Sequence, residues 1–190
     1  MSADTGKIGI LVLVVGPSGA GKDSLIDGAR ETLRGDPSVH FVRRAVTRLA
    51  AGEDHDTVTS AEFDRAERAG AYLLSWRAHG LAYGIPIEIQ MRRREVALVV
   101  ANVSRTVIDD ARRRLQPVHM IAVTAPPAML AERLARRGRE SAAQLASRIP
   151  QAEIDLPEGP DVTRVVNDTS LADGVVAFVA ALRAIRAQAI

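Results

Sequence analysis

The sequence predicts an α/β protein organised around a parallel β-sheet. Three observations support this class. The apolar run at residues 8–15 (IGILVLVV) has apolar side chains on both faces, as a central parallel strand requires. A glycine-rich loop and a helical pattern follow it directly, and further apolar runs then alternate with helical patterns along the chain. A length of 190 residues allows one domain of ordinary size, with room for a small inserted lobe.

Composition excludes several classes of protein. Charged residues make up 25% of the chain and hydrophobic residues 47%, which rules out a collagen-like or wholly disordered chain. Cysteine is absent from the sequence, so disulfide scaffolds, thiolate zinc sites and cysteine nucleophiles are excluded together. The formal net charge is only +2, with basic and acidic residues interspersed, so a nucleic-acid partner is not expected.

Targeting signals are not evident either. No apolar run reaches the ~18 residues that a membrane-spanning helix needs. The first residues, MSADTGK, are polar and do not read as a signal peptide. We therefore expect a cytoplasmic protein without a membrane partner, and the sequence predicts no particular oligomeric state.

The first half of the chain is predicted to form a helix at 22–33, a strand at 39–46, a helix from about 60, and strands at 71–76 and 82–83. A Gly-Asp-Pro sequence ends the first helix, and Ser60 is the expected N-cap of the second. The polar stretch at 47–60 has neither helical nor strand periodicity. Residues 47–92 are therefore expected to form a small mixed insert.

The second half is predicted to form strands at 95–103, 118–124 and 162–166, and helices at 104–115, 126–137, 141–154 and 171–190. A Pro-Pro pair opens the helix at 126–137, and Gly138 ends it. Asn167 and Asp168 follow the last strand, where helix capping by Asp168 or Ser170 is favoured over a contact with the base of a nucleotide.

The loop after the first strand carries the clearest chemistry. Residues 16–22 read GPSGAGK, which matches the phosphate-binding pattern GxxxxGK in its usual place between strand and helix. The glycines allow successive backbone N–H groups to point at phosphate oxygens, and the helix N-terminus adds partial positive charge. Lys22, one of only two lysines in an arginine-rich chain, would bind the β- and γ-phosphates. The expected nucleotide-binding residues are Gly16, Pro17, Ser18, Gly19, Ala20, Gly21, Lys22, Asp23 and Ser24.

One position departs from the usual motif. A Ser or Thr normally follows the lysine and binds magnesium, but here Asp23 follows, with Ser24 one step later. Magnesium is still expected, because it needs only one or two protein ligands beside the nucleotide phosphates. Either Asp23 or Ser24 would supply that ligand, and the sequence leaves the choice open.

Arginines gather in two places where phosphoryl transfer would use them. One group flanks Thr47 in the insert and comprises Arg43, Arg44 and Arg48. The other borders Gly138, where Arg133 and Arg137 are four residues apart on one helix face and Arg148 lies in the next predicted helix. A solvated basic helix face is the alternative interpretation for any single arginine.

These motifs resemble the guanylate kinase-like branch of the nucleoside-monophosphate kinases. The matching segments cover nearly the whole chain: GPSGAGKDS, VTR at 46–48, GEDHDTVTSAEF at 52–63, LLSWRAHGLAYG at 73–84 and RLARRGRES at 133–141. The resemblance implies a P-loop NTPase fold of three α/β/α layers with a parallel sheet. Its core would comprise residues 1–46, 93–136 and 156–190, with an acceptor-binding lobe at about 47–92 and a lid at about 137–155.

The same resemblance implies roles for individual residues. Arg48 and Tyr83 match the residues that hold the acceptor phosphate. Arg133, Arg137 and Arg148 match the lid arginines that close over the phosphates, and with Lys22 they would be the catalytic groups. ATP and Mg²⁺ are the implied cofactors.

Two departures bear on the acceptor. Guanylate kinases have a Glu where this chain has Ser75, and its carboxylate accepts hydrogen bonds from guanine, for which a serine is too short. They also have an acidic segment where this chain reads Asn102-Val103-Ser104-Arg105. The pocket is therefore expected to accept a phosphate ester without guanine.

The Gly-Lys-Asp-Ser, Ser-Trp and Asn-x-Ser-Arg features together resemble the ribose 1,5-bisphosphate phosphokinase family of phosphonate breakdown. This resemblance implies transfer of the γ-phosphoryl group of ATP to ribose 1,5-bisphosphate, giving 5-phosphoribosyl 1-diphosphate and ADP. Ser75, Asn102, Ser104 and Arg105 join the expected residues for this small sugar phosphate. The alternatives are a guanylate kinase, a kinase for another phosphorylated metabolite, and a non-catalytic module that binds a protein.

Overall fold

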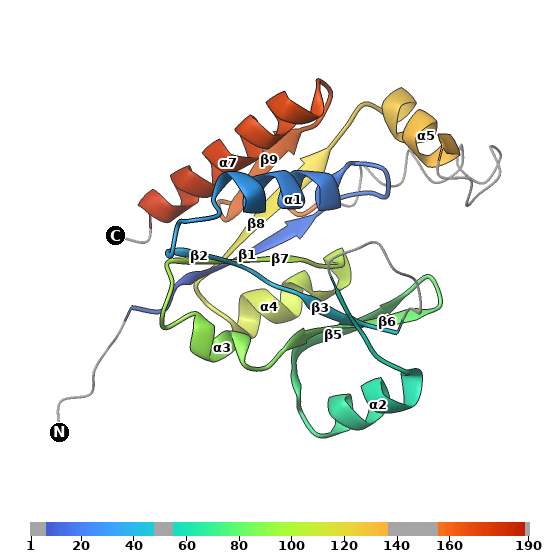
Figure 1. Cartoon of the computed structure of the whole chain (residues 1–190), viewed down its shortest axis with the longest axis vertical. Coiled ribbons are helices and arrows are strands. Elements are labelled where there is room, and N and C mark those ends of the chain that lie inside the picture. The colour runs from blue at the N-terminus through green and yellow to red at the C-terminus, as the bar shows by residue number, and fades with distance from the viewer. Residues whose placement is uncertain (1–6, 48–54, 137–155, 189–190) are drawn as a thin grey trace.

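The computed structural model describes residues 7–47, 55–136 and 156–188, and it contains two β-sheets (Figure 1). The larger sheet has five parallel strands in the order β2-β7-β1-β8-β9. Its strands are β1 (Ile10–Val15), β2 (Val39–Phe41), β7 (Leu98–Asn102), β8 (Val118–Thr124) and β9 (Val162–Val166). Because the strands are parallel, their carboxyl ends lie at the same edge of the sheet. The phosphate loop, which follows β1, and Asn102, which ends β7, both lie at this edge.

Helices cover both faces of this sheet. Helices α1 (Lys22–Thr32) and α7 (Leu171–Ala187) lie on one face, and α4 (Ile108–Arg114) lies on the other (Figure 1). Strand β1 is buried along its whole length, and alternate residues enter different clusters: Val12 and Val14 pack with α1 and α7, whereas Leu11 and Leu13 pack with α4. The predicted three-layer α/β/α class with a parallel sheet is confirmed.

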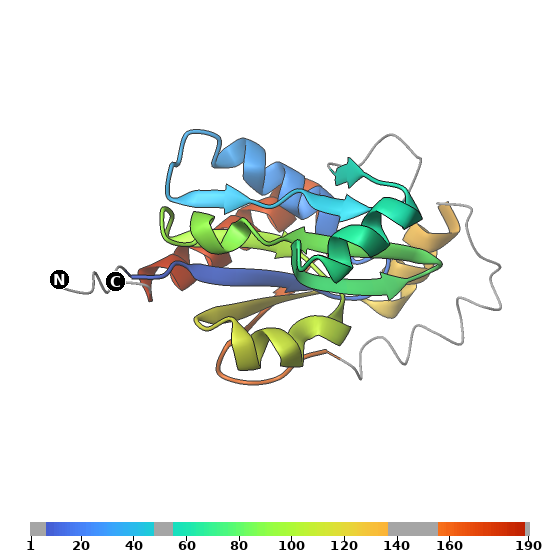
Figure 2. The same ribbon diagram turned by 90° about the horizontal axis from the view of Figure 1, so that it is seen from below.

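The smaller sheet has the strand order β4-β3-β6-β5. Its elements are β3 (Arg44–Val46), β4 (His55–Thr57), β5 (Tyr72–Ala78) and β6 (Leu81–Pro86), with α2 (Ser60–Arg68) beside them. The short helix α3 (Ile89–Arg92) leads back to the larger sheet, and the 3₁₀ turn η1 (Arg105–Val107) precedes α4. Figure 1 shows the hairpin β5–β6 and helix α2 below the larger sheet, on the same side as α4, and Figure 2 shows them from below, in front of that sheet.

The expectation of one strand at 39–46 was wrong, because the chain changes sheets within it. Residues 39–41 pair with β7 of the larger sheet, whereas Ala45 and Val46 pair with β6 of the smaller one. A run of strand-forming residues gives no sign of a change of partner. The predictions also missed α3 and β4, because four-residue and three-residue elements are too short for a period to show.

Capping residues were predicted with mixed success. The N-cap of α2 is Thr59 and not Ser60: its side chain accepts from the backbone N–H of Glu62, and the Glu62 carboxylate accepts from the N–H of Thr59. Ser170 does cap α7, as expected, by accepting from the N–H of Asp173.

The predicted hairpin turn is present, with His79 and Gly80 both at positive φ.

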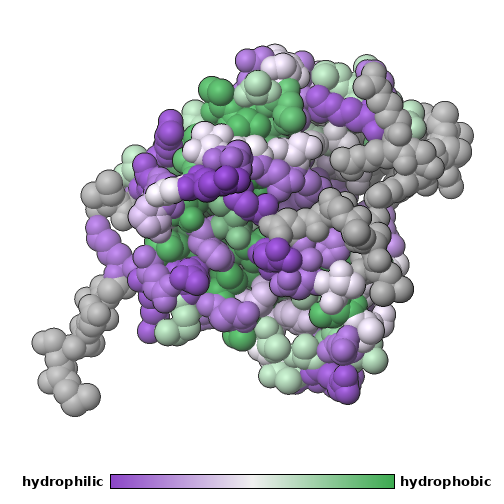
Figure 3. All heavy atoms as spheres, in the orientation of Figure 1, coloured by the Kyte–Doolittle hydropathy of each residue, from purple (hydrophilic) through white to green (hydrophobic). Residues whose placement is uncertain are grey.

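Surface character adds little to the search for a ligand site. Apolar atoms gather over α7 in Figure 3, where Leu171 and Val176 are among the exposed apolar residues. Within the described residues, no helix is long and apolar enough to cross a membrane. The predicted helix at 141–154 lies outside the described residues.

One ion pair joins α4 to the segment before β9. Two nitrogens of Arg112 donate to the two carboxylate oxygens of Asp161, each over 2.8 Å, and the Asp161 backbone carbonyl accepts from the N–H of Met120. The pKa of the Asp161 carboxyl is lowered from its ordinary value, chiefly by these hydrogen bonds from Arg112. The pair therefore stabilises the folded chain only while Asp161 is ionised.

We expect Asp161→Asn to lower the free energy of unfolding by about 1–2 kcal/mol at pH 7, measured by urea denaturation. Because the pKa is lower in the folded chain, this contribution is fully present above about pH 5 and is lost as the pH falls through the folded-state pKa. The difference from wild type should therefore shrink at pH 3. Asp110→Asn, which removes the partner of Arg114 on α4, should cost less than about 0.5 kcal/mol. An undiminished Asp161→Asn deficit at pH 3 would contradict this account.

Candidate active site

The phosphate loop connects β1 to α1 at the carboxyl edge of the larger sheet. Gly16, Gly19 and Gly21 all have positive φ, at 147°, 86° and 89°. A Cβ on Gly16 would overlap the backbone carbonyl of Val123 on the neighbouring strand β8. The motif's glycines are therefore required both by backbone conformation and by close approach to the sheet.

Lys22 begins α1 and folds back over the loop. Its Nζ donates to the carbonyl oxygens of Gly16, over 2.7 Å, and of Pro17, over 3.0 Å. Ser18 is exposed at the tip of the loop, whereas Ala20 is buried beneath it. The ammonium group thus lies across the curl of backbone that the sequence predicts to surround phosphates.

A buried asparagine supports the loop from below. Asn167 is 4% exposed, and its Nδ2 donates to the carbonyl of Ala20 over 2.8 Å. A Cβ on Gly21 would overlap this same Nδ2. The loop conformation is therefore fixed from the end of β9, a role that the sequence analysis did not assign to Asn167.

Arg133, in α5 (Pro127–Arg136), also approaches the loop. Its Nη1 lies 4.0 Å from the position that a Cβ on Gly21 would occupy. This nitrogen is buried and has no hydrogen-bond partner in the described part of the chain. A guanidinium nitrogen without a partner beside a curl of N–H groups fits a bound polyphosphate, because an oxygen of the ligand would supply its acceptor.

The first turn of α1 meets the end of β7 through side chains. Asn102 Nδ2 donates to Asp23 Oδ1 over 2.6 Å, and Arg44 Nη2 lies 3.6 Å from the same oxygen. Arg44 belongs to β3, the first strand of the smaller sheet. Three elements distant in sequence are thus joined at one carboxylate, at the boundary between the two sheets.

Two aromatic rings extend this junction into the smaller sheet. The guanidinium of Arg44 lies 5.7 Å from the centroid of the Tyr83 ring, which stacks on Trp76 at 5.3 Å. Thr47 lies at the edge of the same sheet, where its hydroxyl accepts from the N–H of Ala82. The structure therefore brings the predicted site residues Asp23, Asn102 and Tyr83 together around Arg44, one of the arginines that flank Thr47.

Ser75 lies elsewhere. It precedes Trp76 in β5, so the two side chains point to opposite faces of the strand. The Ser75 hydroxyl donates to Glu67 of α2 over 2.7 Å. Hydrogen bonds from Arg77 and then from Ser75 hold the pKa of the Glu67 carboxyl below its ordinary value. The structure thus groups Ser75 with α2 and not with the Arg44 junction.

Ser104 and Arg105 follow β7 and open the 3₁₀ turn. The Ser104 hydroxyl accepts from the backbone N–H of Thr106, so it caps η1, and Arg105 is exposed. Arg48, Arg137 and Arg148 lie outside the described residues. Within the described ranges, no group of three or more histidine or acidic side chains gathers as a metal-binding cluster.

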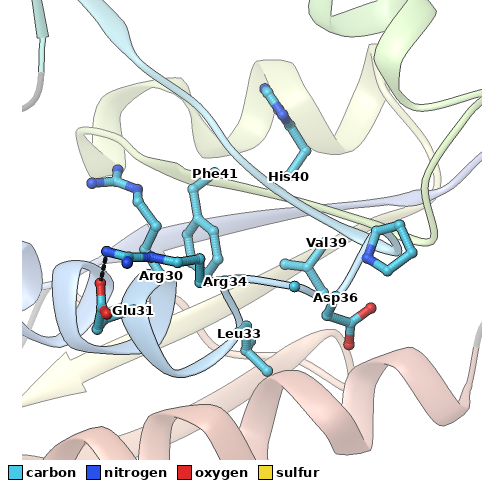
Figure 4. Close-up of a pocket in the computed structure, with 10 residues that line it drawn as sticks. Arg30, Glu31, Leu33, Arg34, Asp36, Val39, His40 and Phe41 are labelled. Atoms are coloured by element: carbon cyan, nitrogen blue, oxygen red, sulfur yellow. Dashed lines mark hydrogen bonds and ion pairs between the residues drawn. The ribbon is translucent and has the colours of Figure 1, made fainter.

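A separate pocket of about 540 Å³ lies at the other end of α1 (Figure 4). Its lining residues include Arg30, Arg34, Asp36, His40 and Phe41. Helix α1 spans 11 residues, which separates this pocket from Lys22 by roughly 15 Å. Burial is the main cause that lowers the pKa of His40. The pocket is therefore not part of the phosphate site.

The fold is similar to that of solved kinases. A guanylate kinase from Anaplasma phagocytophilum superposes with a TM-score of 0.65 at 19% identity, covering 95% of this chain and 87% of that one. A gluconokinase from Sinorhizobium meliloti 1021 gives 0.51 at 17% identity, covering 96% and 95%. The class is thus a guanylate kinase-like P-loop fold of α/β architecture, which at these identities describes the fold alone.

Sequence comparison identifies the family. The chain is 44% identical to the ribose 1,5-bisphosphate phosphokinase PhnN of Brucella melitensis biotype 2, covering 94% of this chain and 93% of the relative. It is 49% identical to the protein of the same name from Rhodopseudomonas palustris, covering 82% and 79%. No family model matches the chain. The chain belongs to the ribose 1,5-bisphosphate phosphokinase family.

Some relatives are much longer. The chain is 48% identical over 177 residues to a bifunctional ribose 1,5-bisphosphokinase-thymidine phosphorylase from Cupriavidus necator. That match covers 92% of this chain and 29% of the relative. The chain therefore spans less than a third of the bifunctional protein and nearly all of the Brucella one.

Proposed function

We propose that the protein transfers the γ-phosphoryl group of ATP to the 1-phosphate of ribose 1,5-bisphosphate, giving 5-phospho-α-D-ribose 1-diphosphate and ADP. The observation that carries this proposal is the Asp23–Asn102 junction beside the phosphate loop, in a chain 44% identical to a ribose 1,5-bisphosphate phosphokinase. Both residues belong to the motifs that separate this family from guanylate kinases in the sequence analysis.

In this reaction an ionised oxygen of the acceptor's 1-phosphate attacks the γ-phosphorus. A new P–O bond forms, and the bond from the γ-phosphorus to the bridging oxygen of ADP breaks. No general base is needed, because the attacking oxygen is already ionised near neutral pH. The protein's contribution is to position the two anions and to stabilise the charge on the transferred group.

The nucleotide half of the proposal rests on the loop and its cations. Backbone N–H groups of residues 16–21 would bind the phosphates of ATP, and Lys22 would exchange its two carbonyl acceptors for phosphate oxygens. Arg133 supports this assignment, because its buried Nη1 has no partner among the described residues and lies beside Gly21. We assign Arg137 and Arg148 to the same role from the motif, within a lid at about 137–155.

Magnesium bound with ATP would neutralise charge on the phosphate oxygens. Ser24 is exposed in the first turn of α1. Asp23 Oδ1, in contrast, already accepts from Asn102 and faces Arg44. Of the two ligands that the sequence left open, Ser24 is therefore the better candidate, and Asp23 is better suited to the acceptor side.

The acceptor half rests on the boundary between the sheets. Tyr83 and Asn102 stand there, and Arg48 follows β3 along the chain. Ser104 and Arg105, at the end of β7, are assigned to the second phosphate of the acceptor. Ser75 would not bind a base, because its side chain is too short to replace a base-binding carboxylate. Its hydroxyl donates to Glu67 instead. Of these residues, Arg48, Ser75 and Tyr83 belong to the proposed acceptor lobe at about 47–92, and the others belong to the core.

A coupled assay of ADP release tests the function, with ATP and Mg²⁺ and with ribose 1,5-bisphosphate or GMP at equal concentration. We expect turnover with the sugar bisphosphate and little turnover with GMP, because the guanine partner is missing. The product should be identified as 5-phospho-α-D-ribose 1-diphosphate by mass. A preference for GMP would reject the proposal in favour of guanylate kinase activity.

A further inference from the structure

Arg44 is a mostly buried cation to which neither the motifs nor the family resemblance assigns a role. Its side chain is 14% exposed, and a guanidinium keeps its positive charge at any physiological pH. Burying a charge is costly unless close partners compensate for the lost water. The contacts of Arg44 therefore indicate what the residue is for.

Those contacts are long. Arg44 Nη2 lies 3.6 Å from Asp23 Oδ1, and Arg44 Nη1 donates to the Asn102 carbonyl over 3.4 Å. Arg44 also lies over the face of the Tyr83 ring, 5.7 Å from its centroid. Arg112 provides a comparison within the same molecule, because its guanidinium makes three hydrogen bonds of 2.8 Å to Asp161 and the Glu158 carbonyl.

The difference between the long contacts of Arg44 and the short hydrogen bonds of Arg112 has a physical meaning. A structural arginine such as Arg112 satisfies its planar fork with carboxylate and carbonyl oxygens inside the protein. Arg44 has the same five donors but reaches only loose partners within the described chain, between the phosphate loop and the smaller sheet. An anion entering this boundary could take the closer geometry that the fork prefers.

We propose that Arg44 binds the phosphate of the acceptor that faces the phosphate loop, and that Asp23 is a positioning residue that orients Arg44 before the acceptor arrives. The proposal rests on the proposed function and adds a residue to its acceptor site. Asn102 completes the arrangement, because its Nδ2 fixes Asp23 Oδ1 over 2.6 Å and its carbonyl accepts from Arg44.

The location suits the reacting phosphate. Asp23 directly follows Lys22, so the Arg44 fork lies near the part of the loop that would face the γ-phosphate. Two phosphates that must react repel each other strongly, and a cation between them lowers that repulsion. Asp23 also gives Arg44 a counter-charge before the acceptor binds, and a phosphate dianion would replace it.

Arg44→Gln in the full chain tests the assignment. We measure the Kd of ribose 1,5-bisphosphate by calorimetry with a non-hydrolysable ATP analogue and Mg²⁺ present, and the KM by coupled assay. Both should rise about 30-fold or more, because a charged partner of the phosphate is lost. The Kd of the ATP analogue alone should stay within about twofold, and Arg44→Lys should restore part of the acceptor affinity.

Arg43→Gln is the matched control. Arg43 is the preceding residue of the chain but is exposed and pairs with Asp56 on β4. Its acceptor Kd should equal that of wild type within about twofold. An Arg44→Gln variant that folds and keeps the wild-type acceptor Kd would overturn the inference, and so would an equal loss in Arg43→Gln.

Asp23→Asn tests the positioning role with a readout that a structural role would not move. The amide can still accept from Asn102 Nδ2, but the negative charge facing Arg44 is gone. We expect the acceptor to bind several-fold more tightly while kcat falls, because one competing charge and one orienting contact are removed together. The magnesium concentration for half-maximal rate should not change. A weaker acceptor Kd, or a raised magnesium requirement, would reject the positioning role for Asp23.

Failure of the inference and failure of the proposed function are distinguishable. If wild type bound ribose 1,5-bisphosphate without turnover, the proposed function would be rejected. The acceptor Kd of Arg44→Gln would still test whether Arg44 binds the acceptor phosphate. Wild type that turns over the sugar bisphosphate, with an unaffected Arg44→Gln variant, would reject only the inference. Wild type that neither binds nor phosphorylates it would reject both.

Discussion

Lys22→Ala is expected to lower kcat by about 100- to 1,000-fold, because it removes the positive charge nearest the transferred phosphoryl group. Lys22 Nζ is bonded to the carbonyls of Gly16 and Pro17, which sit in an accessible loop and can bind water instead. The free energy of unfolding should therefore stay within about 1 kcal/mol of wild type. Coupled ADP release and urea denaturation measure the two quantities.

The chain offers a matched control at its other lysine. Lys7 is exposed and precedes β1, at the end of the sheet far from the loop. Lys7→Ala should keep wild-type kcat and KM. Normal turnover in Lys22→Ala would mean that the loop does not bind the reacting nucleotide, and a matching loss in Lys7→Ala would mean that the effect is not local.

Gly21→Ala should abolish measurable nucleotide binding and also lower the free energy of unfolding by about 1–3 kcal/mol. Gly21 has a φ of 89°, which costs a residue with a Cβ that amount of strain. The added methyl group would also displace Asn167 Nδ2 from its bond to Ala20. Calorimetric titration with ADP and urea denaturation give the two readouts.

Gly35→Ala is the comparison for this variant. Gly35 follows α1 and has no atom within 4 Å of its hypothetical Cβ. ADP affinity should be unchanged, and stability should change by less than about 0.5 kcal/mol. If Gly21→Ala bound ADP as wild type does, the Asn167 support would not control the loop.

The central sheet was predictable from sequence because its inner strands, such as β1 and β8, are buried apolar runs and because helical patterns separate its strands along the chain. Strands at 118–124 and 162–166 agree with β8 and β9 residue for residue. The smaller sheet was harder, since β3 is three residues long and continues a run of strand-forming residues that began in another sheet. Pairing partners depend on tertiary contacts, which a local pattern of apolar residues does not encode.

The candidate site, like the fold, was predictable only in part. The phosphate loop was predictable because its chemistry lies in seven consecutive residues with a known role, from Gly16 to Lys22. The arginine group around Thr47 was recognised, but the sequence did not single out Arg44 within it, because its partners Asp23 and Asn102 are distant in sequence. The only sequence signal for Arg44 is its place in a short arginine-rich segment before Thr47. Asn167 was missed as a support of the loop for the same reason, since Ala20 lies 147 residues away.

Trp76 is the only tryptophan of the chain, and it stacks on Tyr83, which in turn lies beneath Arg44. All the indole emission of the protein therefore originates two side chains away from the proposed phosphate contact. Its indole is 7% exposed, so solvent quenches it little and changes in the adjoining ring dominate its signal. The fold thus carries an intrinsic fluorophore beside the proposed acceptor site, and a change in its emission on addition of the sugar phosphate can be followed without a label.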